Sequence, residues 1–166
     1  MSRGFVREED QEEIPIVPPR ADLPANVTNY VTQVGMDELL DEKQQLIDER
    51  EHLDSANETE RRIASNYISA KLQLLNERII TAQIIDLSKQ PQNEVRFGTL
   101  ITLKIGEDTK LQRYQIVGVD EADIAKGKIS FISPIARILT NKKVGDKAVL
   151  KLANEDRIFE IMEITY

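Results

Sequence analysis

The first half of the chain has the apolar spacing of amphipathic helices. Leu39, Leu46 and Leu53 recur at heptad positions, with Lys43 and Arg50 at the steps between them. The same steps of four and three return at Ile68, Leu72, Leu75, Ile79 and Ala82. No proline or glycine interrupts residues 36–88. We therefore expect two helices, each about 30 Å long at about 1.5 Å per residue, folded back as an antiparallel coiled-coil hairpin.

The second half changes to a period of two, which is typical of β-strands. The alternation predicts strands over residues 95–105, 111–119 and 129–132, and a hairpin of strands over residues 147–152 and 158–165. Ser133 is placed to cap a short helix, with Pro134 at its first position, where a missing amide costs nothing. The predicted fold class is α+β, with an N-terminal coiled-coil helical hairpin followed by a small antiparallel β-rich domain.

Composition shifts divide the chain into four parts. Residues 1–30 are acidic and contain four prolines, which predicts an extended or disordered arm. Residues 31–87 form the helical hairpin, residues 88–93 a polar linker and residues 94–166 the β-rich domain. The arm is interpreted either as a solubilising tail or as a docking segment around Ile14, Ile16 and Val17.

The charge balance narrows the possible partners. The chain has 166 residues and a formal net charge of −7, which disfavours strong independent binding to nucleic acid or to an anionic membrane. It favours a basic protein partner or a metal ion instead. There is no membrane-length apolar run and no signal-peptide core at the N-terminus, so we expect a cytoplasmic protein.

The absence of cysteine excludes disulfides and thiolate metal sites. His52 is the only histidine, so it has no second imidazole beside it with which to hold a metal. Acidic residues crowd the predicted turn of the hairpin, and Asp54, Glu58 and Glu60 are the candidate functional residues there. The alternative is a solvated helix end, where such residues are common. We expect no metal site within the isolated protein.

Asp120 lies in a short acidic segment with Glu121 and Asp123. This segment lacks the ligand offsets and closing glutamate of a calcium loop. We therefore expect it to shape the surface of the β-rich domain and to offer carboxylates to a basic partner.

Several segments resemble the bacterial transcript-cleavage factors (the Gre factors). They include "VTQVGMDELLDEKQQL", "RIITAQIIDLSKQP" and "YQIVGVDEADIAKGKISFISPIARILTNKKVGD". The resemblance implies that the second domain is like the FKBP-type prolyl isomerases. It also implies that this domain docks on RNA polymerase at the secondary channel, with Ser133, Pro134 and Ile135 near the contact surface.

The resemblance further implies how such a factor acts. The hairpin enters the channel, and its tip acids help to hold a second Mg²⁺ that is supplied in the polymerase active site. The polymerase then cleaves the backtracked transcript, so the factor is not itself an enzyme, needs no cofactor of its own, and meets the 3′ end of the nascent RNA only indirectly.

The tip departs from the family pattern. Cleavage-active members carry a motif close to GD-(L/R)-x-EN-A-(D/E)-Y, whereas residues 54–67 read "DSANETERRIASNY". The hairpin is also shorter than in the best-known members. Two functions remain open: stimulation of cleavage, or regulation of polymerase from the same channel without cleavage. A prolyl isomerase is a third possibility, but 5% aromatic residues and no tryptophan disfavour its aromatic-lined pocket.

Overall fold

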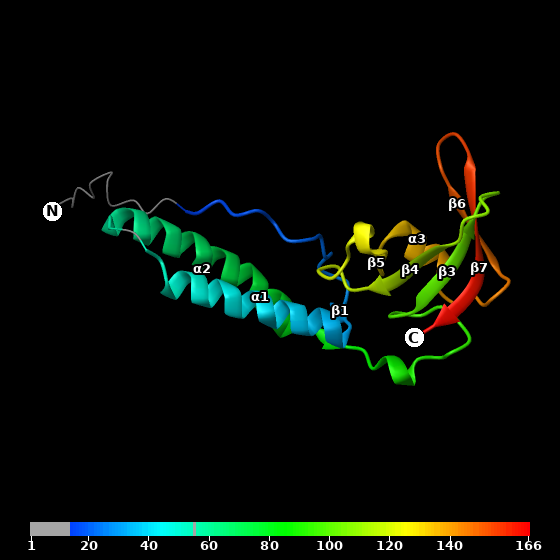
Figure 1. Ribbon diagram of the computed structural model, residues 1–166, viewed down its shortest axis with the longest axis horizontal. Coiled ribbons are helices and arrows are strands. Elements are labelled where there is room, and N and C mark those ends of the chain that lie inside the picture. The colour runs from blue at the N-terminus through cyan, green and yellow to red at the C-terminus, as the bar shows by residue number, and fades with distance from the viewer. Residues whose placement is uncertain (1–13, 55) are drawn as a thin grey trace, which may run out of the picture.

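The computed structural model describes residues 14–54 and 56–166. It is elongated, with a pair of helices at one end and a β-sheet at the other (Figure 1). The predicted fold class is confirmed, because an N-terminal helical pair precedes a β-rich domain. Below, "hairpin" means the two long helices and their connection, "tip" means residues 52–54 and 56–60, and "β-domain" means residues 94–166.

The hairpin consists of α1 (Gln33–Glu51) and α2 (Glu58–Thr81). Thr32 begins α1 by accepting a hydrogen bond from the amide of Gly35, and Asn57 caps α2 in the same way. The side chains buried between the helices are those that the heptad pattern placed on one seam. They are Leu39, Leu46, Ile68, Leu72 and Leu75, with Val31 at the base.

A small parallel ladder that the sequence did not predict joins the base of the hairpin. Strand β1 (Tyr30–Val31) precedes α1 and pairs with β2 (Gln83–Ile84), which follows α2. A 3₁₀ helix, η2 (Leu87–Lys89), then leads toward the β-domain. The two ends of the hairpin are therefore tied together by backbone hydrogen bonds, in addition to side-chain packing.

The β-domain is a five-stranded sheet with the order β5-β4-β3-β7-β6. Its strands are β3 (Leu100–Ile105), β4 (Gln112–Val117), β5 (Lys128–Ser130), β6 (Lys147–Lys151) and β7 (Asp156–Thr165). The 3₁₀ helix η3 (Ile124–Lys126) leads from β4 to β5, which pairs with β4 in parallel. The sheet is therefore mixed, not wholly antiparallel as expected.

Helix α3 (Pro134–Leu139) contributes to the core of the β-domain. Ala136 and Leu139 of this helix are fully buried in one cluster with Ile101, Phe159 and Ile161 of the sheet. The predicted cap is present, because the hydroxyl of Ser133 accepts a hydrogen bond from the amide of Ala136 at 3.3 Å. The sequence pattern therefore located this short helix correctly.

The predicted strand over residues 95–105 is wrong at its start. Strand β3 begins only at Leu100, because residues 96–99 form a turn in which the amide of Thr99 donates to the carbonyl of Arg96 at 3.1 Å. Gly98 has a φ of 87°, which a pleated strand does not accommodate. Val95 and Thr99 are still fully buried, which explains why their spacing resembled a strand.

The described part of the N-terminal arm, residues 14–29, contains neither helix nor strand. It runs beside the hairpin before entering β1 (Figure 1). Ile14 and Ile16 are 88% and 93% exposed. The rest of the predicted arm, residues 1–13, lies outside the described residues.

Candidate functional site

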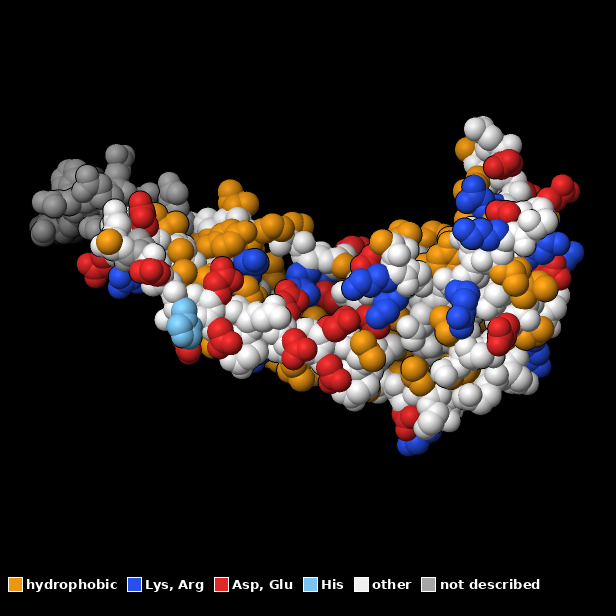
Figure 2. Space-filling view, viewed as in Figure 1, with side chains coloured by type: hydrophobic (Ala, Val, Ile, Leu, Met, Phe, Trp, Pro, Cys, Tyr) orange, Lys and Arg blue, Asp and Glu red, His pale blue; other side chains and the backbone are white. Residues whose placement is uncertain are grey.

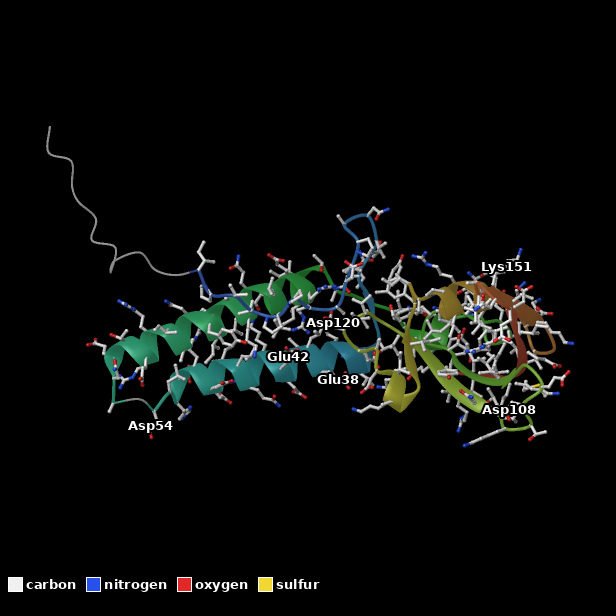
Figure 3. The ribbon with its side chains drawn as sticks, turned by 90° about the horizontal axis from the view of Figure 1, so that it is seen from above. Glu38, Glu42, Asp54, Asp108, Asp120 and Lys151 are labelled. Carbon is white, nitrogen blue, oxygen red and sulfur yellow. The ribbon has the colours of Figure 1, made fainter. Side chains whose placement is uncertain are left out.

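The tip lies at the end of the hairpin farthest from the β-domain, as the position of Asp54 in Figure 3 shows. His52 caps the C-terminal end of α1, and its backbone amide donates to the carbonyl of Asp48 at 3.0 Å. The imidazole Nδ1 of His52 lies 2.8 Å from the same carbonyl oxygen. This nitrogen is therefore engaged at the helix end.

The structure brings the three predicted tip acids to this end of the hairpin. Asp54 lies in the connection, and Glu58 and Glu60 lie in the first turn of α2; all three are exposed. The first turn carries the positive end of the helix dipole, which stabilises carboxylates there. Acidic side chains also line much of the visible face of the hairpin, whereas basic ones are more frequent on the β-domain (Figure 2).

A complete metal site is absent from the described residues: no group of three or more His, Asp or Glu side chains is arranged to hold an ion. The tip acids nevertheless belong to the ligand type that Mg²⁺ prefers. They can supply part of a ligand set when another molecule supplies the remainder.

The second predicted contact region is the start of α3. Pro134 is exposed, Ser133 is half-buried, and Ile135 is half-buried against the core of the β-domain. Pro134 is therefore the residue of this region that is most accessible to a partner, whereas Ile135 contributes mainly to packing within the β-domain.

Asp120 does not lie on a free surface. Its side chain is only 7% exposed, and Oδ1 accepts a hydrogen bond from Nε of Arg20 at 2.9 Å. Its Oδ2 lies 3.8 Å from Nε of Arg78, in α2. We therefore correct the expectation that Asp120 offers a carboxylate to a partner, because this carboxylate is occupied within the chain, at the joint between the hairpin and the β-domain.

A second buried carboxylate lies at the same joint. Glu121 is 7% exposed; one oxygen accepts a hydrogen bond from the hydroxyl of Thr32, and the other lies 3.1 Å from Nζ of Lys128. Glu121 thus links the start of α1 to the β-domain.

Three aromatic rings pack together at the joint. The ring of Tyr30 lies 6.0 Å from that of Phe97 and 5.7 Å from that of Phe131, measured between centroids. The sequence pattern did not identify these rings, or Arg20 and Arg78, as joint residues, because no local period connects positions so far apart in the chain.

Comparison with known proteins identifies the family. The model of the C-terminal domain of the GreA/GreB transcription elongation factors matches residues 90–166. Transcription elongation factor GreA of Maricaulis maris is 39% identical over 121 residues, which are 70% of this chain and 76% of that protein. The chain belongs to the GreA/GreB family.

Other GreA/GreB proteins agree with this assignment. Transcription elongation factor GreA of Beijerinckia indica is 35% identical over 127 residues, covering 74% of this chain and 80% of that protein. The solved structure of the prokaryotic transcription elongation factor GreA/GreB from Nitrosomonas europaea aligns over 85% of this chain and all of that one, at 15% identity and a TM-score of 0.42. With so low a score, the assignment rests on the sequence relatives.

No helix in residues 14–54 or 56–166 is long and apolar enough to cross a membrane.

Proposed function

We propose that this chain, as a transcription elongation factor, binds RNA polymerase at the secondary channel and stimulates cleavage of backtracked transcripts. The β-domain docks at the channel entrance through the surface at Ser133 and Pro134, and the hairpin extends inward. The observation that carries the proposal is the set of three exposed carboxylates at the tip, at the opposite end of the molecule from the β-domain.

The chemistry assigned to the tip matches its side chains. A second Mg²⁺ in the polymerase active site stabilises the attacking oxygen during phosphodiester hydrolysis. Asp54, Glu58 and Glu60 would supply carboxylate oxygens to that ion, and the polymerase and water would supply the remaining ligands. The hydrolytic centre belongs to the polymerase, so this chain acts as an accessory that completes the centre.

The hairpin projects as a slender body from the β-domain (Figure 1). Its helices have 19 and 24 residues, which correspond to about 28 and 36 Å at about 1.5 Å per residue. The buried leucine seam makes the pair one stiff body, because each helix covers the apolar face of the other.

A second function has a specific observation in its favour. The tip sequence from Asp54 to Tyr67 departs from the motif of cleavage-active members. A factor with such a tip would enter the same channel and regulate polymerase without activating hydrolysis. The two functions share the docking surface and differ only in what the tip acids do.

A cleavage assay separates the two functions. A backtracked elongation complex with labelled RNA is incubated with the protein, or with a variant in which Asp54, Glu58 and Glu60 are all alanine. Cleavage stimulation predicts shortened RNA with the native protein and a rate about 100-fold lower with the variant, because several kcal/mol of charge stabilisation is lost.

The matched control removes three exposed acids away from the tip: Glu38, Asp41 and Glu155. This control variant should stimulate cleavage as strongly as the native protein does. If the native protein gives no shortened RNA at saturating concentration but still competes for the polymerase, regulation without cleavage is the function. If it fails to bind polymerase at all, both functions are rejected.

A further inference from the structure

The N-terminal arm, residues 14–29, has no role in the function proposed above, yet it is packed against the rest of the protein. Val17, Pro19 and Leu23 line one shallow hollow together with Leu74 of α2. Val17 and Leu23 are half-buried, whereas Ile14 and Ile16 on the same segment are exposed. One face of the arm therefore covers α2.

Arg20 is the residue through which the arm contacts both halves of the molecule. Its Nη1 and Nη2 donate to the two carboxylate oxygens of Glu42, in α1, at 2.7 and 3.0 Å. Its Nε donates to Oδ1 of Asp120, in the β-domain, at 2.9 Å. Figure 3 labels both carboxylates, one on the hairpin and one at the joint. A single guanidinium thus connects the arm, the hairpin and the β-domain.

The contact with Asp120 is protected from water, whereas the contact with Glu42 is partly open to it. The side chains of Arg20 and Asp120 are 19% and 7% exposed, and that of Glu42 is 41% exposed. The hydrogen bonds with Glu42, and then the one with Asp120, raise the pKa of Arg20, although burial acts in the opposite direction. The bidentate geometry fixes the orientation of the guanidinium on Glu42, and burial strengthens the single charge-assisted bond to Asp120.

Arg78 contributes a second link at the same place. Its Nη2 donates to the carbonyl of Ala21 in the arm, and its Nε lies 3.8 Å from Oδ2 of Asp120. Within the described residues, Oδ2 of Asp120 and Nη1 of Arg78 are buried without a hydrogen-bond partner. The direct link between α2 and Asp120 is therefore loose, and Arg20 makes the closer contact with this carboxylate.

We propose that the N-terminal arm is a strap that sets the direction of the hairpin relative to the β-domain, with Arg20 as its positioning residue. The other joint contacts, among them the aromatic cluster and Glu121, hold the two halves together close to β1, where a small rotation moves the tip a long way. Arg20 contacts Glu42, in the third turn of α1, and so resists that rotation. The consequence for RNA cleavage rests on the proposed function, but the strap itself does not.

A distance measurement on the full chain tests the strap without polymerase. The chain has no cysteine, so cysteines introduced at Glu49 and Lys151, both exposed, can be spin-labelled selectively. Pulsed electron spin resonance then gives the distribution of distances between hairpin and β-domain. Arg20→Ala should give a distribution about twice as wide as the native one, because a small interface between domains permits relative motion by default.

Two variants act as controls. Asp22→Ala removes an exposed acid from the same arm and should leave the distribution unchanged. Arg20→Lys keeps the charge but loses the planar fork, so it should restore the native width only in part. The proposal is overturned if Arg20→Ala gives the native mean and width. If Arg20→Ala does not fold, as judged by circular dichroism, the distance distribution is measured with Glu42→Gln instead. A native mean and width in that variant would likewise overturn the proposal.

The polymerase assay then measures the consequence. Arg20→Ala should leave the half-saturating concentration unchanged, because the docking surface is intact. It should lower the maximal cleavage rate about tenfold, because misplacement of a reacting group by about 1 Å is costly. If the native protein does not stimulate cleavage, the proposed function fails while the distance measurement still decides the strap. A wide distribution with an unchanged cleavage rate would overturn the link between strap and tip.

Discussion

Glu121 of the β-domain lies directly against Gly35 of α1: a Cβ atom built on Gly35 would be 2.7 Å from Oε1 of Glu121. This carboxylate cannot easily move away, because it is bonded to Thr32 and to Lys128. We predict that Gly35→Ala lowers the free energy of unfolding by about 1–3 kcal/mol through overpacking. The loss outweighs the gain in helix propensity of up to about 1 kcal/mol. Urea denaturation measures the difference.

Val34→Ala is the matched control for this change. Val34 is the neighbouring residue in the first turn of α1 and is 54% exposed, so its truncation should change stability by less than about 0.5 kcal/mol. A Gly35→Ala variant as stable as the native protein would show that the Glu121 side chain can shift to accommodate the added methyl group.

The hairpin core is small, so its stability should depend strongly on single residues. Leu75 is fully buried between the helices, and we predict that Leu75→Ala costs about 2–5 kcal/mol. Ile80, on the same helix, is 81% exposed, and Ile80→Ala should cost less than about 0.5 kcal/mol. Thermal unfolding followed by circular dichroism compares the two variants. Equal losses of stability in the two variants would contradict the position of Leu75 in the buried interface between the helices.

Asn57 controls the start of α2, next to two tip acids. Its side-chain oxygen accepts hydrogen bonds from the amides of Thr59 at 2.9 Å and Glu60 at 3.3 Å. We predict that Asn57→Ala destabilises this turn by about 1 kcal/mol, whereas Asn57→Ser retains most of the cap. Amide hydrogen exchange at Thr59 and Glu60 should therefore be faster in the alanine variant. Unchanged exchange rates would show that the cap does not hold the turn.

Asp86 provides a local prediction about pH. A hydrogen bond from the Ser88 hydroxyl, and then one from the Ser88 amide, lower the pKa of Asp86. Because the folded value lies below the unfolded value of about 3.9, this stabilisation is present above that pH and is lost as the pH falls through the folded pKa. Ser88→Ala should raise the pKa of Asp86 in a carboxyl NMR titration. An unchanged pKa would contradict the assigned cause.

The helices were predictable because their signal is local. Residues such as Leu39, Leu46 and Leu72 repeat at a period that only a helix brings to one face, so the seam could be located from spacing alone. The same holds for the cap at Ser133, whose hydrogen bond spans only three residues. The family resemblance came from equally local segments.

What the sequence did not reveal depends on distant pairs. Asp120 was expected to face a partner, but it bonds to Arg20, which lies 100 residues earlier in the chain. No periodicity connects such positions, and an acid that pairs internally looks the same in the sequence as one that pairs with another protein. The start of β3 was misplaced for a different reason. Val95 and Thr99 are buried at a spacing that resembles the alternating pattern of a strand, but the turn at Gly98 prevents a strand from forming there.

The order of the strands has a consequence for how the protein emerges from the ribosome. Helices α1 and α2 are neighbours in the chain, so the hairpin can form while later residues are still being translated. The sheet cannot be completed during translation in the same way. Strand β7 lies between β3 and β6 and is the last of the five strands to be synthesised, so β3 cannot pair with it until the end of translation. During that interval one edge of β3 has no neighbouring strand, so slowing synthesis between Lys104 and Glu160 should increase aggregation of the nascent chain.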